Sequence, residues 1–140
     1  MKKLAYAVIW VISIGLFSCA EMESNDSQII TGAWLLYEQG YSPGGGYVVK
    51  SVSDSPPQVI VLNQDGTLTS TMDGWKDYKY YQVLKDTMVL ALFKLDPGSQ
   101  PKKIEELDHS YNITFKDGGL RLEYRFCMEG CHLAFKKVTE

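Results

Sequence analysis

The chain has 140 residues, of which 45% are hydrophobic and 22% are charged, and its formal net charge at pH 7 is −3. This length suits one domain with one hydrophobic core. The acidic balance argues against nucleic acid and against anionic lipid headgroups as electrostatic partners.

The first element in the chain is an apolar run, from Leu4 to Phe17, that follows Lys2 and Lys3 and contains no charged residue. The run is shorter than the roughly 20 residues that a helix needs to cross a bilayer. It therefore predicts a removable export signal rather than a permanent membrane anchor.

The end of this run, Leu16-Phe17-Ser18-Cys19, resembles the lipobox of bacterial lipoproteins, although Phe17 departs from the usual small or lightly branched residue. The resemblance implies a lipoprotein signal peptide at residues 1–18 and lipidation of Cys19, which would attach acyl chains such as palmitate. Several acyl chains, each contributing about 0.8 kcal/mol per buried methylene, would anchor the protein stably to a membrane.

The mature chain implied by this resemblance begins at Cys19 and has 122 residues, with 12 basic and 17 acidic side chains and a net charge of −5. Ala20 follows the cysteine, which by analogy with known lipoproteins favours the outer membrane. Its periplasmic and cell-surface faces both remain open, and Glu21 and Glu23 resemble acidic surface-export signals. The polar residues 19–28 predict a lipidated tether, and we expect the folded domain at residues 29–140.

Beyond the tether, short β-rich runs alternate with Gly, Pro, Asn and Asp at intervals of about ten residues. No long stretch has a helical period, so the pattern predicts an all-β, antiparallel barrel or sandwich. The one candidate for a short helix is Lys102–Asp108, which follows Pro101. The strands are expected at Trp34–Gln39, Tyr47–Val52, Gln58–Asn63, Thr67–Met72, Tyr78–Val83, Thr87–Phe93, Tyr111–Phe115, Leu120–Phe126 and Leu133–Val138.

Two kinds of strand can be distinguished by their side-chain pattern. The run Leu120–Phe126 alternates apolar and charged residues, which predicts one buried and one wet face, with Phe126 on the buried face. The runs 59–62 and 88–93 are apolar on both faces. Their second faces need cover from a loop, the short helix, a partner surface or a ligand.

Gly32-Ala33-Trp34, at the start of the first strand, looks like the Gly-x-Trp signature of lipocalins. Together with the export signal, the hairpin around Asp65-Gly66-Thr67 and the closing segment around Cys127 and Cys131, it resembles small bacterial lipocalin-like lipoproteins. The resemblance covers about residues 31–138 and implies an up-and-down, calycin-like barrel of eight to nine strands. Trp34 would plug one end, with Arg121 or Arg125 packed over it. Any other β domain with a buried tryptophan remains the alternative.

The three cysteines divide naturally, because lipidation consumes Cys19 and leaves Cys127 and Cys131 in an oxidising compartment. We expect these two to form a disulfide. The side-chain parity of the flanking strands predicts that the bridge closes a wide loop or a bulge rather than a regular ladder. Haem attachment at Cys127–His132, and a zinc site that adds His132 and His109, are alternatives with weaker spacing.

Aromatic residues provide the candidate ligand pocket or barrel end. Trp75, Tyr78 and Tyr80, with Trp34, could stack against a flat ligand, although core packing explains the same pattern. Trp75 lies near a turn and is the aromatic residue that we expect to be exposed at an opening.

No catalytic motif and no cofactor or metal motif stands out, so we expect a protein that is not an enzyme. The only dense titratable group, Glu105, Glu106, Asp108 and His109, could support hydrolysis but is also typical of a solvated turn. The preferred hypothesis is a noncatalytic barrel that holds a small apolar or amphipathic ligand at its mouth. The alternative is a protein-interaction module, an envelope assembly accessory or an enzyme inhibitor, that uses the loop at Gly44–Tyr47 or Met128–Gly130.

Overall fold

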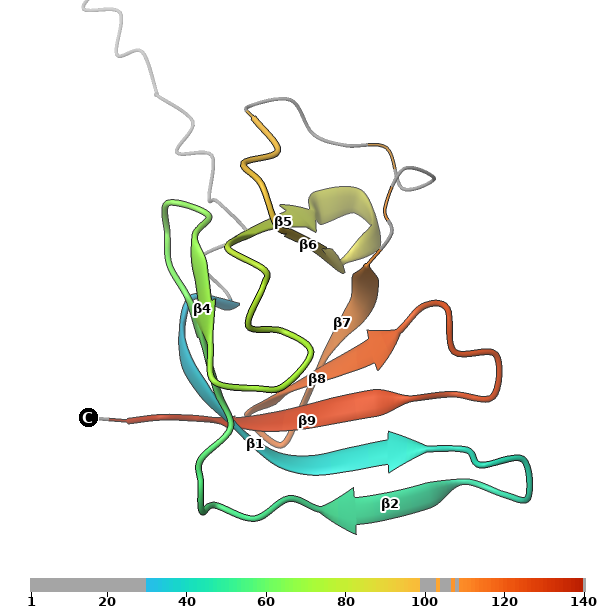
Figure 1. Cartoon of the computed structure of the whole chain (residues 1–140). Coiled ribbons are helices and arrows are strands. Elements are labelled where there is room, and N and C mark those ends of the chain that lie inside the picture. Colours follow the sequence, from blue (N-terminus) through green and yellow to red (C-terminus); the bar gives the residue numbers. More distant parts are fainter. Residues whose placement is uncertain (1–29, 99–102, 104–106, 108, 140) are drawn as a thin grey trace, which may run out of the picture.

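The computed structural model describes residues 30–98, 103, 107 and 109–139 (Figure 1). The export signal, Cys19 and the tether lie outside these residues, and so does most of the predicted helix at 102–108. Each of the nine predicted strands corresponds to an observed one. The elements are β1 Gly32–Tyr41, β2 Val48–Ser51, β3 Val59–Leu62, β4 Leu68–Ser70, β5 Tyr80–Leu84, the 3-10 turn η1 Lys85–Thr87, β6 Val89–Phe93, β7 Ser110–Lys116, β8 Gly119–Tyr124 and β9 His132–Lys137.

Eight of these strands form a ring in which every neighbouring pair is antiparallel. The order is β4-β3-β1-β9-β8-β7-β6-β5, and a bridge between Thr67 and Tyr80 joins the two ends of this sheet. Beside the bridge, the backbone N–H of Leu68 donates to the carbonyl of Lys79 over 2.8 Å. The prediction of an antiparallel barrel of eight to nine strands is confirmed.

Strand β1 is paired differently along its two halves. Its first half, Gly32–Leu35, pairs with β3, whereas its second half, Glu38–Tyr41, pairs with β2, which lies outside the ring. Both halves pair with β9 on the other side, with a bulge between Leu36 and Glu38. An extra residue reverses the order in which side chains alternate between the faces. The alternation of inward and outward side chains along β1 therefore differs between the two ends of the barrel.

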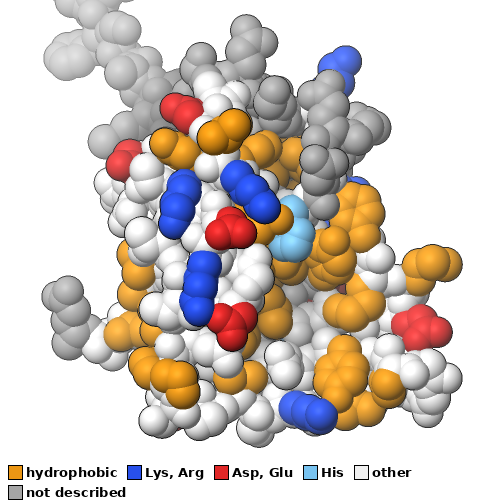
Figure 2. Space-filling view, viewed as in Figure 1, with side chains coloured by type: hydrophobic (Ala, Val, Ile, Leu, Met, Phe, Trp, Pro, Cys, Tyr) orange, Lys and Arg blue, Asp and Glu red, His pale blue; other side chains and the backbone are white. Residues whose placement is uncertain are grey.

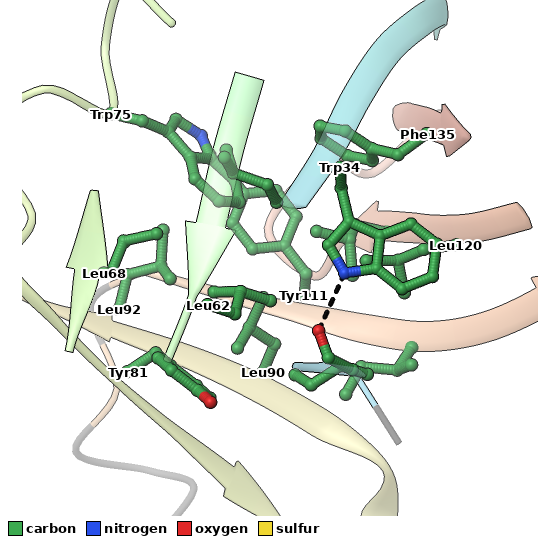
Figure 3. Packing of buried hydrophobic residues seen from close by; sticks show 14 of the residues in the cluster. Trp34, Leu62, Leu68, Trp75, Tyr81, Leu90, Leu92, Tyr111, Leu120 and Phe135 are labelled. Atoms are coloured by element: carbon green, nitrogen blue, oxygen red, sulfur yellow. Dashed lines mark hydrogen bonds between the residues drawn. The ribbon is translucent and has the colours of Figure 1, made fainter. Parts of the chain in front are cut away.

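The hydrophobic core fills the ring (Figure 3). It contains the buried residues Ile30, Trp34, Leu36, Ile60, Leu62, Leu68, Met72, Trp75, Tyr81, Leu90, Leu92, Tyr111, Ile113, Leu120, Leu122 and Phe135. On the outer face of β6, Val89 and Ala91 are covered by Leu107, with Leu84 and Phe93 packed around them. This strand's second apolar face is thus covered from within the chain.

One end of the barrel is closed by Trp34, which is only 2% exposed. Its indole Nε1–H donates to the carbonyl of Ile30 over 2.7 Å, and the Nζ of Lys137 lies 5.6 Å from its ring centroid. Neither Arg121 nor Arg125 takes this place, and Arg121 instead forms an ion pair with Glu123 on its own strand. Lys137 takes this place because the register of β1 and β9 sets it directly opposite Trp34.

Two expectations about exposure were wrong. Strand β8 ends at Tyr124, so Phe126 lies in the following loop and is 54% exposed instead of facing the core. Trp75 is buried at 4% exposure, because its turn folds it against Tyr111. Among the described residues, no helix is long and apolar enough to cross a bilayer.

Candidate ligand-binding site

A cavity of about 340 Å³ lies at the end of the barrel opposite Trp34. It lies where four adjacent strands, β1, β9, β8 and β7, come together, and its volume falls near the small end of the range for ligand pockets, roughly 300–1,000 Å³. The lining residues are Gln39, Gly40, Tyr41, Tyr111, Leu122, Tyr124, Cys131, His132 and Leu133.

The bulge in β1 explains why Gln39 and Tyr41 reach this cavity. Leu36 faces the core opposite Phe135, and beyond the bulge Gln39 pairs with Leu133. Without the extra residue at Tyr37, the alternation would place Gln39 and Tyr41 on the outer face. The open end therefore depends on an irregularity in the strand that also carries Trp34.

Tyr111 is the polar centre of the cavity wall. Its hydroxyl accepts a hydrogen bond from Trp75 Nε1 at 3.1 Å and lies 2.8 Å from His109 Nε2. Burial raises the pKa of Tyr111 above its ordinary value of 10. Burial, followed by the charge of Lys94, lowers the pKa of His109 below 6.5. At neutral pH the Tyr111 hydroxyl therefore donates to a neutral imidazole, and the tyrosine ring is held in one orientation.

Further aromatic rings surround His109 behind the cavity wall. Tyr78 stacks on it, with the ring centroids 4.8 Å apart and the planes 18° apart, and Tyr124 lies 5.3 Å away. Phe126 continues the cluster at 5.7 Å from Tyr124. Tyr111 and Tyr124 in the wall are consequently held by ring packing rather than by charge.

The four aromatic residues proposed from the sequence lie in three different places, and none lines the cavity. Trp75 and Tyr78 support the wall from behind, through Tyr111 and His109. Tyr80 lies in the bridge that closes the ring, and Trp34 lies at the opposite end. Figure 3 shows Trp75 near Tyr111 within the packed interior.

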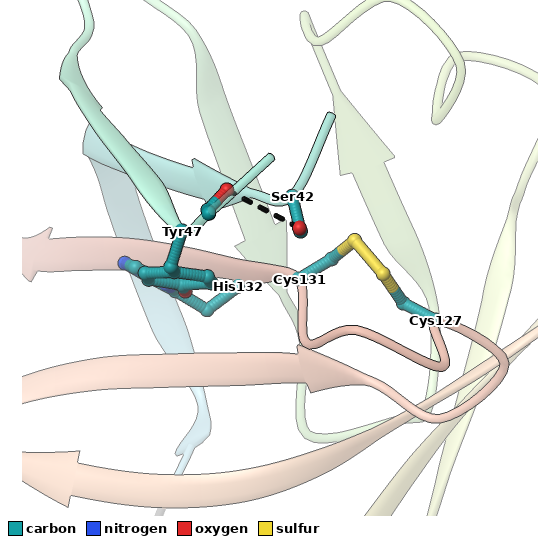
Figure 4. Close-up of a disulfide and its surroundings, with 6 residues drawn as sticks. Ser42, Tyr47, Cys127, Cys131 and His132 are labelled. Carbon is teal, nitrogen blue, oxygen red and sulfur yellow. Dashed lines mark hydrogen bonds between the residues drawn. A yellow bond between two sulfur atoms is a disulfide. The ribbon is translucent and has the colours of Figure 1, made fainter. Parts of the chain in front are cut away.

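Cys127 and Cys131 form a disulfide, with their Cα atoms 5.7 Å apart, in the loop 125–131 between β8 and β9. The expected wide, stapled loop is confirmed. Beside it, the Tyr47 and His132 rings lie next to each other (Figure 4), and the Tyr47 hydroxyl hydrogen bonds to Nδ1 of His132. His132 Nε2 lies 2.9 Å from a carboxylate oxygen of Glu38. His132 is 3% exposed. These contacts tie loop 42–47 to the start of β9, next to the disulfide.

Sequence reasoning missed most of the lining. The alternation of Tyr111 with Ile113, and of Leu122 with Tyr124, marks their shared inner face, and this signal could have placed three of the lining residues. It could not have placed Gln39 and Tyr41, because no residue type near Tyr37 signals a bulge. The partnership of His132 with Tyr47 joins segments that are 85 residues apart.

The sequence also raised a zinc site, haem attachment and a hydrolytic group as alternatives. The part of the chain that the structure describes contains no group of three or more His, Cys, Asp or Glu side chains arranged to hold a metal ion. The sulfur atoms of Cys127 and Cys131 are bonded to each other rather than available for zinc or haem. Glu105, Glu106 and Asp108 lie outside the described residues, so the proposed hydrolytic group is represented only by His109.

Comparison of the chain with protein-family models, curated protein sequences and solved structures gives no match.

Proposed function

We propose that this protein is a noncatalytic binding barrel that holds a small apolar or amphipathic molecule at its open end. The observation that carries the proposal is the cavity of about 340 Å³, whose lining includes three tyrosines and two leucines and no Asp, Glu, Lys or Arg. Few polar groups reach it, and the hydroxyl of Tyr111 already has partners in Trp75 and His109. Such a wall favours contact with an apolar surface over chemical attack on a substrate.

We further propose a lipocalin-like lipoprotein of the outer membrane, lipidated at Cys19. The closed ring and the buried Trp34 at one end support the likeness. The carbonyl of Ile30, the first described residue, accepts the hydrogen bond from Trp34, so the described domain begins at the closed end.

The ligand is tested by extracting the protein from its native membrane and analysing it by mass spectrometry under denaturing conditions. We expect a small apolar or amphipathic compound at a stoichiometric amount. Repeated preparations without any bound compound would contradict the proposal. Matched preparations of Leu133→Trp, which narrows the cavity, should lose the compound and thereby separate it from lipid carried along with the anchor.

The anchor is tested independently by metabolic labelling with palmitate. We expect label on the wild-type chain and none on Cys19→Ser, with the variant released from the membrane fraction. Label that persists on Cys19→Ser would exclude this attachment site. The outcome does not depend on the cavity, so the two parts of the proposal can fail separately.

A second candidate function, interaction with an envelope protein, is favoured by the meeting of two exposed loops. A Cβ atom built on Gly130 would lie 3.6 Å from Cε2 of Tyr47, so loops 42–47 and 125–131 are neighbours. Met128 is fully exposed, and Phe126 and Tyr47 are about half exposed. Both loops project at the right of Figure 1, and hydrophobic side chains gather on the same side in Figure 2.

Affinity capture from solubilised envelopes tests this second function, with Met128→Glu as the control variant. A partner that binds wild type and is lost with Met128→Glu would support the interaction surface. The absence of any stable partner, or one that binds both forms equally, would count against it.

A further inference from the structure

We infer that the ligand is an amphipathic anion, with its apolar body in the cavity and its charged group beside Lys50 at the rim. This inference rests on the proposed binding function and adds the ligand's charge and orientation. It is carried by the contrast between the uncharged lining of the cavity and the position of one lysine at its edge.

The interior of the cavity offers no partner for a charged group. Its lining contains tyrosine, leucine, glutamine, glycine, cysteine and histidine, and no Asp, Glu, Lys or Arg. His132, the one histidine in the lining, projects to the opposite face from Leu133, and its two ring nitrogens contact Tyr47 and Glu38 there. A charge buried here without a partner would be unfavourable, so the part of the ligand that enters the cavity is uncharged.

Lys50 is placed at the rim by the pairing of β1 with β2. It lies directly opposite Gln39, which lines the cavity, and cross-strand partners project to the same face of a sheet. Its Nζ atom lies 5.1 Å from the ring centroid of Tyr41, another lining residue. The cation is therefore held over the cavity wall rather than on the outer surface of the barrel.

Lys50 has no carboxylate partner among the described residues, since the ion pairs there involve other cations. Glu38, the acidic residue nearest to it along β1, projects to the other face, where it contacts His132. Asp54, beyond the end of β2, lies 3.9 Å from Lys136, and Glu129 is exposed in loop 125–131. Lys50 thus remains available to a carboxylate or sulfonate at the mouth.

The same arrangement disfavours a cationic ligand. Tyrosine rings attract cations, but the Nζ atom of Lys50 already lies over the ring of Tyr41, at 5.1 Å from the centroid. A ligand ammonium group at this ring would compete with Lys50 and would be repelled by it. An anion gains from the same charge.

A matched pair of fluorescent probes tests the inference: 8-anilinonaphthalene-1-sulfonate and N-phenyl-1-naphthylamine, which differ only by the sulfonate. Binding is measured on the exported full chain carrying Cys19→Ser, so that no acyl chain or detergent competes for the cavity. We expect the sulfonate probe to bind more tightly, and added salt to weaken its binding while leaving the neutral probe unaffected.

Lys50→Glu should weaken binding of the sulfonate probe by about five- to tenfold, as charge reversal at a partly solvated site implies. It should leave binding of the neutral probe unchanged. The matched control is Lys85→Glu, an equal charge change at an exposed residue of η1. Near-ultraviolet circular dichroism confirms that each variant retains its packed tyrosines.

The outcomes separate the two proposals. If neither probe binds, the small-ligand function itself fails. If the neutral probe binds at least as tightly as the sulfonate, and Lys50→Glu changes neither, the cavity binds ligands but the assignment of an anion is wrong. An equal loss with Lys85→Glu would assign the effect to overall charge and would likewise overturn the role of Lys50.

Discussion

Strand β1 runs through both ends of the barrel, but its neighbours and its packing differ between them. At the closed end, β1 lies between β3 and β9, and Trp34 is buried with its N–H bonded to Ile30 and Lys137 over its ring. At the open end, β3 no longer flanks β1, and β2 pairs with it outside the ring. The bulge at Tyr37 lies between these two halves of β1. One local irregularity therefore separates the packed end, with Trp34, from the end with the cavity.

The largest effect should follow removal of the plug. Trp34→Ala should lower the free energy of unfolding by about 3–5 kcal/mol, because it leaves a large void in a site that is 2% exposed. Urea denaturation measures this loss. Tyr41→Ala, at the half-buried wall of the open end, should cost less than about 2 kcal/mol. Equal losses from the two variants would mean that the ends are not packed differently.

The second-largest loss of stability should follow removal of the disulfide, because the bridge constrains only a loop at the open end. Cys127→Ser with Cys131→Ser should lower the free energy of unfolding by at most about 2 kcal/mol, since the bridged residues are only four positions apart and close a short ring. Thermal unfolding of the oxidised, reduced and double-variant proteins measures the effect. A loss as large as that of Trp34→Ala would show that loop 125–131 supports the whole barrel.

Much of the fold could be predicted from the sequence, because the alternation of side chains and the turn residues depend on local geometry. Leu120, Leu122 and Tyr124 alternate with charged residues, and Asp117-Gly118 supplies the positive φ angles of the hairpin before them. Little of the candidate site could be predicted, because the cavity depends on a bulge and on contacts between segments that are distant in the sequence. Trp75 illustrates the limit: its place near a turn suggested exposure, but tertiary packing against Tyr111 buries it.

A substitution at the rim should affect ligand binding without affecting the core. Gln39→Trp places a large ring over the cavity from an exposed position, so we expect affinity for N-phenyl-1-naphthylamine to fall about tenfold, or about 1.4 kcal/mol. Stability should change by no more than about 0.5 kcal/mol. Val138→Trp, at the closed end and similarly exposed, is the matched control. Unchanged probe binding with Gln39→Trp would show that the probe enters elsewhere.

The open end should also respond to pH through His109. Because burial lowers the pKa of His109 below 6.5 in the folded protein, the unfolded chain binds the proton more readily. The contribution of His109 to the free energy of unfolding is therefore fully present above pH 6.5 and is lost as the pH falls through its lowered pKa. Urea denaturation from pH 8 to pH 5 measures the slope, which His109→Gln should reduce. An identical slope in the variant would assign the pH dependence to other groups.

The smallest effect concerns an unsatisfied polar group beside the open end, on the outer face of β7. Ser110 is fully buried opposite Ala91, and its hydroxyl has no hydrogen-bond partner in the part of the chain that is described, in contrast to the bonded indole of Trp34. Burying such a hydroxyl without a partner is unfavourable, so Ser110→Ala should leave stability unchanged or raise it by up to about 1 kcal/mol. Thermal and urea unfolding should agree on the sign. A clear loss of stability would mean that the hydroxyl is bonded in solution and that the open end is as fully satisfied as the closed one.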